Sequence, residues 1–295
     1  MKNNQMAGVG ELSTVTSLFD KAWDLYKKVF ITLMRVNIVP VVVLAYLSVV
    51  TAFATAYFKN VIMVTDKFND IEQFRFFALM LGFFCVSVLI SSLVYIAQIK
   101  TIETIDSNNE EFKGKTRASI YKQILGIYKN SASSVSSYIW IAILATLSIF
   151  FGFVFLIVPG IVFAVWFCFA PFALILENKK GKSALLESKL YVRGLWNPIF
   201  YRIVAIIAFM FLIGFARAVF QIFLNTIFGA GLNDRFVVDI IFQSVISPFF
   251  IVYMYVLYKD VMEVRNSKSE VEGVSTNAPG TETEVAVEEL PEKGI

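Results

Sequence analysis

Six long apolar runs follow one another along the chain, and short segments that carry charges or turn residues separate them. A helix needs about 20 apolar residues to cross the hydrocarbon core of a bilayer. The runs reach roughly this length and lack the apolar–polar alternation of membrane β-strands. The pattern predicts an all-α, polytopic helical membrane protein with six transmembrane helices. The predicted spans are residues 36–58, 76–97, 138–158, 160–177, 198–216 and 237–258.

The third and fourth runs meet at the sequence VPGI. Pro159 and Gly160 fit the central positions of a type II turn, because proline presets φ at the first and glycine supplies positive φ at the second. A tight antiparallel hairpin is therefore expected here, and the six spans are expected to form three hairpins. Pro40, Pro171 and Pro248 lie inside runs, where neighbouring helices can accommodate a kink.

A short amphipathic segment precedes each pair of runs. In residues 15–30, 117–129 and 176–198, apolar residues recur at helical spacing on one face and lysines lie on the other. Such a helix lies in the membrane interface, with its lysines near anionic headgroups. Each hairpin is therefore expected to follow a cytoplasmic amphipathic helix. The predicted apolar faces are Val15, Leu18, Phe19, Ala22, Tyr26, Val29 and Phe30; Ile120, Tyr121, Ile124, Ile127 and Tyr128; and Ala184, Leu185, Ser188, Tyr191, Val192 and Leu195.

The distribution of lysine and arginine predicts the orientation. All but five of the 26 basic residues fall on one side of the predicted membrane, and such an excess marks the cytoplasmic side. Both termini are therefore expected in the cytoplasm, in a bacterial-type inner (cell) membrane. Anionic lipid headgroups are the expected partner, and a membrane-protein partner is left open. The five exceptions are Lys59, Lys67, Arg75, Arg217 and Arg235.

Composition supports a lipid environment. Hydrophobic residues make up 57% of the chain and charged residues 17%, against about 25% charged residues in a soluble chain. The predicted transmembrane domain covers residues 13–265, after a flexible N-terminus of residues 1–12. Residues 266–295 are rich in acidic residues and lack aromatic ones, which predicts a disordered acidic tail.

The residue types in the chain do not favour an enzyme. The chain has no histidine, which removes the commonest general base and transition-metal ligand. Cys85 and Cys168 lie inside apolar runs, where cysteine is usually a packing residue. We therefore expect no catalytic residue, no metal, no cofactor and no enzyme activity. The basic loops alternate with membrane spans, so lipid headgroups and not nucleic acid are their expected partners.

Glu177 is the first candidate site, at the cytoplasmic end of the fourth run. An acid at this end of a helix opposes the helix dipole, so a basic partner such as Lys180, Lys189 or Arg193 is expected. We favour a structural lock between the hairpin and the following amphipathic helix over a proton carrier.

Further polar candidates lie in the other runs. Arg217 and Asp239 fall near the predicted outer interface, either as a pair that gates or binds, or as a snorkelling arginine and a helix-start acid. The second reading is favoured. Polar patches also interrupt two runs, with Gln243, Ser244 and Ser247 in the sixth and Ser87, Ser91 and Ser92 in the second.

The second half of the chain carries a set of recognisable stretches. They are LIVPGIVFAVWFCFAPFALILE, SALLESKLYVRGLW and LYKDVMEVR, which contain Pro159, Gly160, Pro171, Glu177 and Trp196. Over about residues 156–265 they resemble the membrane domain in front of some bacterial glycerophosphodiester phosphodiesterases. The resemblance implies a six-helix bacterial membrane protein without an activity of its own. None of the family's catalytic residues matches a position here, and only the acidic tail follows the sixth run.

Three function classes follow from these features. The favoured class is a multi-pass, non-enzymatic membrane component with a structural, accessory or lipid-interacting role. The alternative is a transporter or permeation protein for an apolar or amphipathic solute, with a polar cavity between the second, fourth and sixth spans lined by the serines. A lipid-acting membrane enzyme is least favoured, because it would need Glu177 to converge with Asp106 or Asp260.

Overall fold

The helices of the protein follow the apolar runs. The computed structural model describes residues 12–65, 70–107, 117–228 and 242–276. Nearly all of these residues are helical, and none of them forms a strand. In chain order the elements are α1 (Val15–Thr65), α2 (Asp70–Ser107), α3 (Arg117–Phe155), α4 (Ile157–Phe167), α5 (Ala170–Leu176), α6 (Lys182–Val192), α7 (Trp196–Phe228), the π-helical turn η1 (Phe242–Ile246) and α9 (Ser247–Thr276).

Six helical stretches among the described residues are long and apolar enough to cross a membrane. The fourth stretch comprises α4 and α5 together. The prediction of an all-helical, multi-pass membrane protein is confirmed at this level. The stretches are Pro40–Lys59, Gln73–Ser107, Lys122–Phe155, Ile157–Leu176, Trp196–Leu224 and Ser244–Lys268.

Two amphipathic segments are continuous with the spans that follow them. α1 runs unbroken for 51 residues and contains both the segment 15–30 and the first span. α3 joins the segment 117–129 to the third span in the same way. The third segment forms a separate helix, α6, because Gly194 adopts a φ of 81° just after the helix.

The turn between α3 and α4 lies earlier than the sequence predicts. α3 ends at Phe155, and the extended backbone of Leu156 (φ −162°, ψ 146°) leads directly into α4. Pro159 and Gly160 therefore stand in the first turn of α4 and do not form a type II turn. A first helical turn accepts proline because the N–H that proline lacks would have no helical acceptor there.

Two glycines let α3 and α4 approach closely. A Cβ on Gly152 would stand 2.8 Å from the Gly160 Cα, and a Cβ on Gly160 would stand 2.5 Å from Cγ of Phe153. Either contact would force the two helices apart. Gly160 therefore matters for helix packing, which is a different role from the positive φ that the sequence suggested.

The fourth span is broken between α4 and α5. Pro171 stands near the start of α5, and its missing N–H favours the break. Ser188 of α6 bonds the backbone there, because its hydroxyl donates to the Trp166 carbonyl at 2.6 Å and accepts the Phe169 N–H at 3.1 Å. This buried serine thus joins α6 to the interrupted span.

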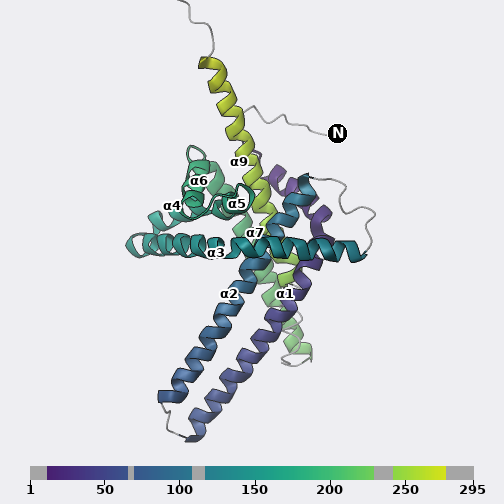
Figure 1. Ribbon diagram of the computed structural model, residues 1–295, viewed down its shortest axis with the longest axis vertical. Helices are drawn as coiled ribbons and strands as arrows, with labels where there is room; N and C mark the ends of the chain where they lie inside the picture. The colour runs from purple at the N-terminus through teal and green to yellow at the C-terminus, as the bar shows by residue number, and fades with distance from the viewer. Residues whose placement is uncertain (1–11, 66–69, 108–116, 229–241, 277–295) are drawn as a thin grey trace, which may run out of the picture.

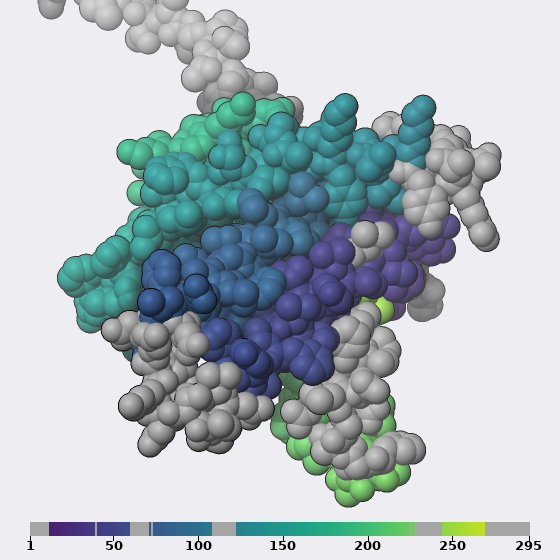
Figure 2. Space-filling model, turned by 60° about the horizontal axis from the view of Figure 1, so that its bottom comes forward, coloured from purple at the N-terminus to yellow at the C-terminus, as the bar shows by residue number. Residues whose placement is uncertain are grey.

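The long helices meet around α9 and diverge away from it (Figure 1). α9 contacts α1, α2, α6 and α7. α1 and α2 run side by side, and α3 crosses this pair in the view of Figure 1, where both helices continue beyond the crossing. In Figure 2 the teal tip of α3 and α4 and the green end of α7 project in different directions. The long helices therefore diverge from one shared region of contact around α9.

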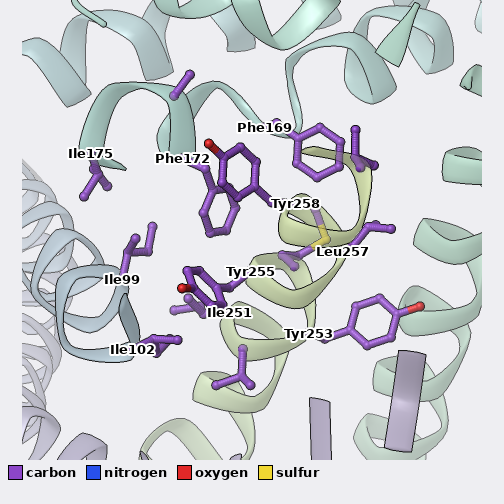
Figure 3. Packing of buried hydrophobic residues seen from close by; sticks show 14 of the residues in the cluster. Ile99, Ile102, Phe169, Phe172, Ile175, Ile251, Tyr253, Tyr255, Leu257 and Tyr258 are labelled. Carbon is purple, nitrogen blue, oxygen red and sulfur yellow. The ribbon is translucent and has the colours of Figure 1, made fainter. Parts of the chain in front are cut away.

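The buried core lies at this junction. In the stretch Ser244–Lys268, which joins the end of η1 to α9, 61% of the most apolar 18 residues are buried. The share is 6–11% in the corresponding 18 residues of α1, α2, α3 and α7. Tyr255 and Tyr258 of α9 pack against Phe169 and Phe172 beside the α4–α5 break (Figure 3). Outside this core the long helices expose many large apolar side chains, as helices in contact with lipid do.

The predicted apolar faces are buried against other helices. Leu18, Ala22 and Val29 of α1 are fully buried in the core. On the same face Tyr26 is buried, and Val15, Phe19 and Phe30 are partly buried. All six residues predicted for the third segment are buried. Protein covers these residues where the sequence suggested the acyl region of the membrane. The side chains of Ile120 and Tyr121 lie outside the described set.

α9 extends further than predicted. It continues to Thr276, so the predicted boundary at residue 265 falls inside a helix. Residues 266–276 are helical because elongating an existing helix fixes little chain per added hydrogen bond and no proline interrupts them. The predicted flexible N-terminus and the rest of the predicted tail, residues 1–11 and 277–295, lie outside the described residues.

Candidate functional site

Glu177 stands at the C-terminal end of α5, beside α6 and α9. Its two carboxylate oxygens accept hydrogen bonds from the hydroxyls of Tyr191 in α6 and Tyr258 in α9. Burial, together with the hydrogen bond to Glu177, raises the pKa of Tyr191 above its usual value, so this hydroxyl stays protonated as a donor. The Arg265 guanidinium lies 5.3 Å from the centre of the Tyr191 ring. The Glu177 carboxylate thus connects α5, α6 and α9.

Tyrosine hydroxyls bind Glu177 where the sequence suggested a basic partner. Lys189 Nζ stands 4.2 Å from the centre of the Trp166 ring, in a cation–π contact. Lys180 and Arg193 are exposed. Two hydroxyl donors satisfy both oxygens of Glu177 and avoid desolvating a second charge, which explains why tyrosines replace the expected cations.

A second carboxylate, Asp260 of α9, holds the start of α1. Its Oδ2 accepts the Ser13 N–H at 2.8 Å, and its Oδ1 accepts the Ser13 hydroxyl at 2.7 Å. Lys21 Nζ donates to Ser13 Oγ at 2.7 Å and stands 3.6 Å from Asp260 Oδ1. Ser13 and Asp260 are both buried, so this link is shielded from solvent.

Arg202 of α7 also holds the start of α1, through hydrogen bonds to backbone carbonyls. Its Nε donates to the Ser13 carbonyl at 2.9 Å, and its Nη2 donates to the Leu12 carbonyl at 3.0 Å. Its Nη1 donates to the Pro198 carbonyl at 2.7 Å, so backbone oxygens surround the buried guanidinium. The Tyr253 hydroxyl of α9 donates to the Arg202 carbonyl at 3.0 Å. We call Ser13, Glu177, Tyr191, Arg202, Tyr258 and Asp260 the α9 junction.

Sequence reasoning missed the link between Ser13, Arg202 and Asp260. The sequence marks Arg202 only as one of the many basic residues on the predicted cytoplasmic side, and Asp260 only as a candidate acid. The available signal was an arginine a few residues inside an apolar run, since an ionisable residue in a membrane helix usually has a specific partner. The partner itself lies 189 residues away along the chain, which no local pattern reveals.

Asp106 lies beside α9 and has partners of its own, Tyr255 and Lys259. Its Oδ2 accepts the Tyr255 hydroxyl at 3.0 Å and stands 3.5 Å from Lys259 Nζ. Asp106 and Asp260 line an open cavity of about 740 Å³, and Glu177 is not part of its lining. Glu177 therefore shares this cavity with neither Asp106 nor Asp260, whereas a lipid-acting enzyme was expected to bring it together with one of them.

A second cavity of about 490 Å³ lies among the membrane-spanning helices, and we call it the polar cavity. α1, α2, α3 and α9 enclose it, whereas the sequence suggested the second, fourth and sixth spans. No described residue of the fourth span belongs to the lining. Its first part, α4, packs against α3, α6 and α7, and its second part, α5, packs against α2, α3 and α6. The lining carries no charged residue. Its polar residues are Asn37, Ser87, Ser91, Ser92, Tyr95, Gln98, Tyr138 and Ser247.

Two amides stand out in this lining. Gln98 Nε2 donates to Asn37 Oδ1, and the buried Asn37 Nδ2 has no hydrogen-bond partner among the described residues. Leaving a buried donor unsatisfied costs about 1–3 kcal/mol. Ser87 and Ser92, in contrast, donate their hydroxyls to carbonyls of their own helix at 2.8 Å and 2.7 Å. The unsatisfied donor is thus Asn37, which the sequence analysis did not single out although it begins an apolar run.

The remaining predicted residues are scattered. Arg217 lies inside α7, which continues well beyond it, so it does not mark the end of that helix. Asp239 lies outside the described residues, so its favoured role as a helix-start acid and the alternative of a pair with Arg217 both stay untested. Ser244 is buried in η1 and Ser247 lines the polar cavity. The side chain of Gln243 also lies outside the described set.

Candidate metal ligands and comparisons with known proteins do not narrow the function further. Among the described residues, no three His, Cys, Asp or Glu side chains are grouped so that they could hold a metal ion. None of the family models, curated proteins or solved structures compared with the chain matches it. The resemblance to the membrane domain of glycerophosphodiester phosphodiesterases therefore stays a prediction.

Proposed function

We propose that the chain is a non-enzymatic membrane component that interacts with lipid in a structural or accessory role. The observation that carries this proposal is the use of the carboxylates around α9. Glu177, Asp106 and Asp260 are each bonded to side chains of other helices. An acid held in this way supports helix packing, whereas a catalytic acid needs access to a substrate.

The proposed topology has three hairpins, each preceded by a cytoplasmic amphipathic helix, in a bacterial-type inner membrane. Both termini are cytoplasmic in this proposal. Two features support it: the lysine and arginine excess on one side, and the arrangement in Figure 1. There the beginning of α1, the helices α5 and α6 and the charged part of α9 gather on the side away from the α1–α2 tip.

A lipid-turnover experiment tests the absence of activity. The purified protein is placed in vesicles of phosphatidylethanolamine and phosphatidylglycerol, and lipids and soluble products are followed by mass spectrometry. We expect the same lipid composition with wild type, Glu177→Gln and protein-free vesicles. A product that accumulates with wild type and disappears with Glu177→Gln would contradict the proposal and favour an enzyme.

The polar cavity favours permeation of an amphipathic solute as a second candidate function. A transport path needs polar groups among the spans, and this cavity supplies them. Vesicles loaded with a fluorescent amphipathic amine provide the test. A permeation protein would release the dye faster than protein-free vesicles do, and Val88→Trp would block the release by filling the cavity. Release at the protein-free rate would remove this candidate.

A further inference from the structure

The residues that line the polar cavity differ between its two ends. Asn37 and Gln98 form one end, at the edges of the first two predicted spans, and Phe84 lies at the other end. Fourteen residues of α2 separate Gln98 from Phe84, which corresponds to about 21 Å along a helix. The hydrocarbon core is about 30 Å thick. The cavity therefore runs from the level of the membrane interface deep into the hydrocarbon.

The lining sets the chemistry of an occupant. It contains no charged residue, so a charged group gains no partner inside it. At the interfacial end the Asn37 amide offers a donor that no described residue accepts, and Leu44 and Val88 provide an apolar wall further along. A suitable occupant has an uncharged acceptor, such as a carbonyl, followed by a hydrocarbon chain.

The rim of the cavity faces the lipid. Phe84 is 66% exposed and Ser91 is exposed, and both belong to a part of α2 that other helices barely cover. The volume of about 490 Å³ falls within the range of about 300–1,000 Å³ for small-molecule sites. A lipid molecule can therefore enter sideways from the bilayer and leave its headgroup at the interface.

We propose that the polar cavity binds one acyl lipid, whose ester carbonyl accepts a hydrogen bond from the Asn37 amide. Its chain lies along Leu44 and Val88 toward Phe84. This inference rests on the proposed membrane function and names the lipid chemistry involved. The bound carbonyl satisfies the amide after a small rotation of the Asn37 side chain, which explains why a buried donor is retained among apolar neighbours.

Photochemical labelling tests the site. The full-length protein is placed in vesicles of a diester phosphatidylcholine that contain a trace of the same lipid with a diazirine in its acyl chain. After illumination, labelled peptides are quantified by mass spectrometry. We expect labelling of the segment around Val88 to exceed that of the lipid-facing segment around Phe211 at least threefold. Equal labelling of the two segments would overturn the proposal.

Matched tryptophan variants separate the cavity from the outer surface. Val88→Trp and Leu44→Trp fill the cavity, whereas Leu89→Trp and Val42→Trp add the same ring at exposed neighbouring positions. The two cavity variants are expected to lower the labelling ratio to about one, and the two surface variants to leave it unchanged. Having two pairs protects the test against the loss of one variant through misfolding. Wild-type labelling in both cavity variants would overturn the site.

The role of the carbonyl is tested by competition. A diether phosphatidylcholine lacks the ester carbonyl and keeps the chains and headgroup. One hydrogen bond of about 1 kcal/mol corresponds to about a fivefold preference, so the diester should compete about fivefold better in wild type. Asn37→Leu should abolish this preference. Equal competition in wild type would refute the assigned hydrogen bond.

The photochemical labelling experiment distinguishes a failure of the lipid site from a failure of the proposed membrane function. If the segment around Phe211 is labelled and the cavity segment is not enriched, the lipid site is wrong and the membrane protein stands. If no segment is labelled at all, the proposed membrane function fails together with the lipid site.

Discussion

Pro40 lies inside α1 without ending the helix, and Tyr128 supplies the reason. A proline has no N–H, so the Val36 carbonyl loses its partner four residues later. The Tyr128 hydroxyl of α3 donates to that carbonyl at 2.6 Å. In lipid an unsatisfied carbonyl is costly, and a side chain from a neighbouring helix removes the cost. Single polar residues therefore decide where these helices touch.

Glu177 and Tyr258 are expected to stabilise the fold as a coupled pair. Tyr258→Phe removes one donor and Glu177→Gln removes the charge that accepts it, so the free energy of unfolding should fall by about 1–2 kcal/mol in each variant. The double variant should lose less than the sum, with a coupling of about 0.5–2 kcal/mol. Circular dichroism during denaturation in detergent measures these values.

The control for this pair is Tyr201→Phe, which removes a hydroxyl from an exposed ring. It should change the free energy of unfolding by less than about 0.5 kcal/mol. Strictly additive losses in the Glu177→Gln, Tyr258→Phe double variant would show that the hydrogen bond between them does not contribute to stability.

Asp260→Leu is expected to destabilise the attachment of α1. The substitution leaves the N–H and hydroxyl of Ser13 without acceptors in a buried site. A loss of about 2–4 kcal/mol in the free energy of unfolding follows from two such groups. Glu263→Leu is the matched control, because Glu263 is exposed on the same helix. Equal stability of the two variants would contradict the role assigned to Asp260.

At the scale of elements, hydrophobic periodicity predicted which helix faces are buried. Leu18 and Ala22 in α1 and Tyr191 and Val192 in α6 are buried as their spacing indicates. The pattern did not show what covers those faces, because lipid and a neighbouring helix both favour apolar residues. It also placed the α3–α4 turn at Pro159, since a proline–glycine pair fits a turn and a first helical turn equally well.

The close packing of α3 against α4 depends on two glycines, Gly152 and Gly160. Gly160→Leu is expected to lower the free energy of unfolding by about 1–3 kcal/mol, because its Cβ would overlap the Phe153 ring. Gly214→Leu in α7 is the control, since a Cβ there meets no atom within 4 Å. That variant should be neutral or slightly more stable, because leucine favours a helix more than glycine does. The reverse order of stabilities would show that the close approach is unimportant.

At the scale of the molecule, the protein joins diverging apolar helices through one buried junction around α9. The lengths and apolar character of the six runs were sufficient to predict a multi-pass helical protein. The junction was not predictable in the same way, because Ser13, Arg202 and Asp260 come from distant parts of the chain. The polar cavity likewise brings Asn37 and Gln98 together from separate helices. Sequence reasoning found Ser247 and the serines of α2, which share that lining.

The topology is the central claim, and cysteine accessibility tests it most directly. Cys85 and Cys168 are replaced by serine, and single cysteines are introduced as Lys59→Cys and Lys180→Cys, both at exposed positions. Intact bacterial cells are treated with a membrane-impermeant maleimide before and after permeabilisation. We predict that the cysteine at position 59 reacts in intact cells and that the one at position 180 reacts only after permeabilisation. Reaction of both from the same side of the membrane would contradict the proposed arrangement of spans.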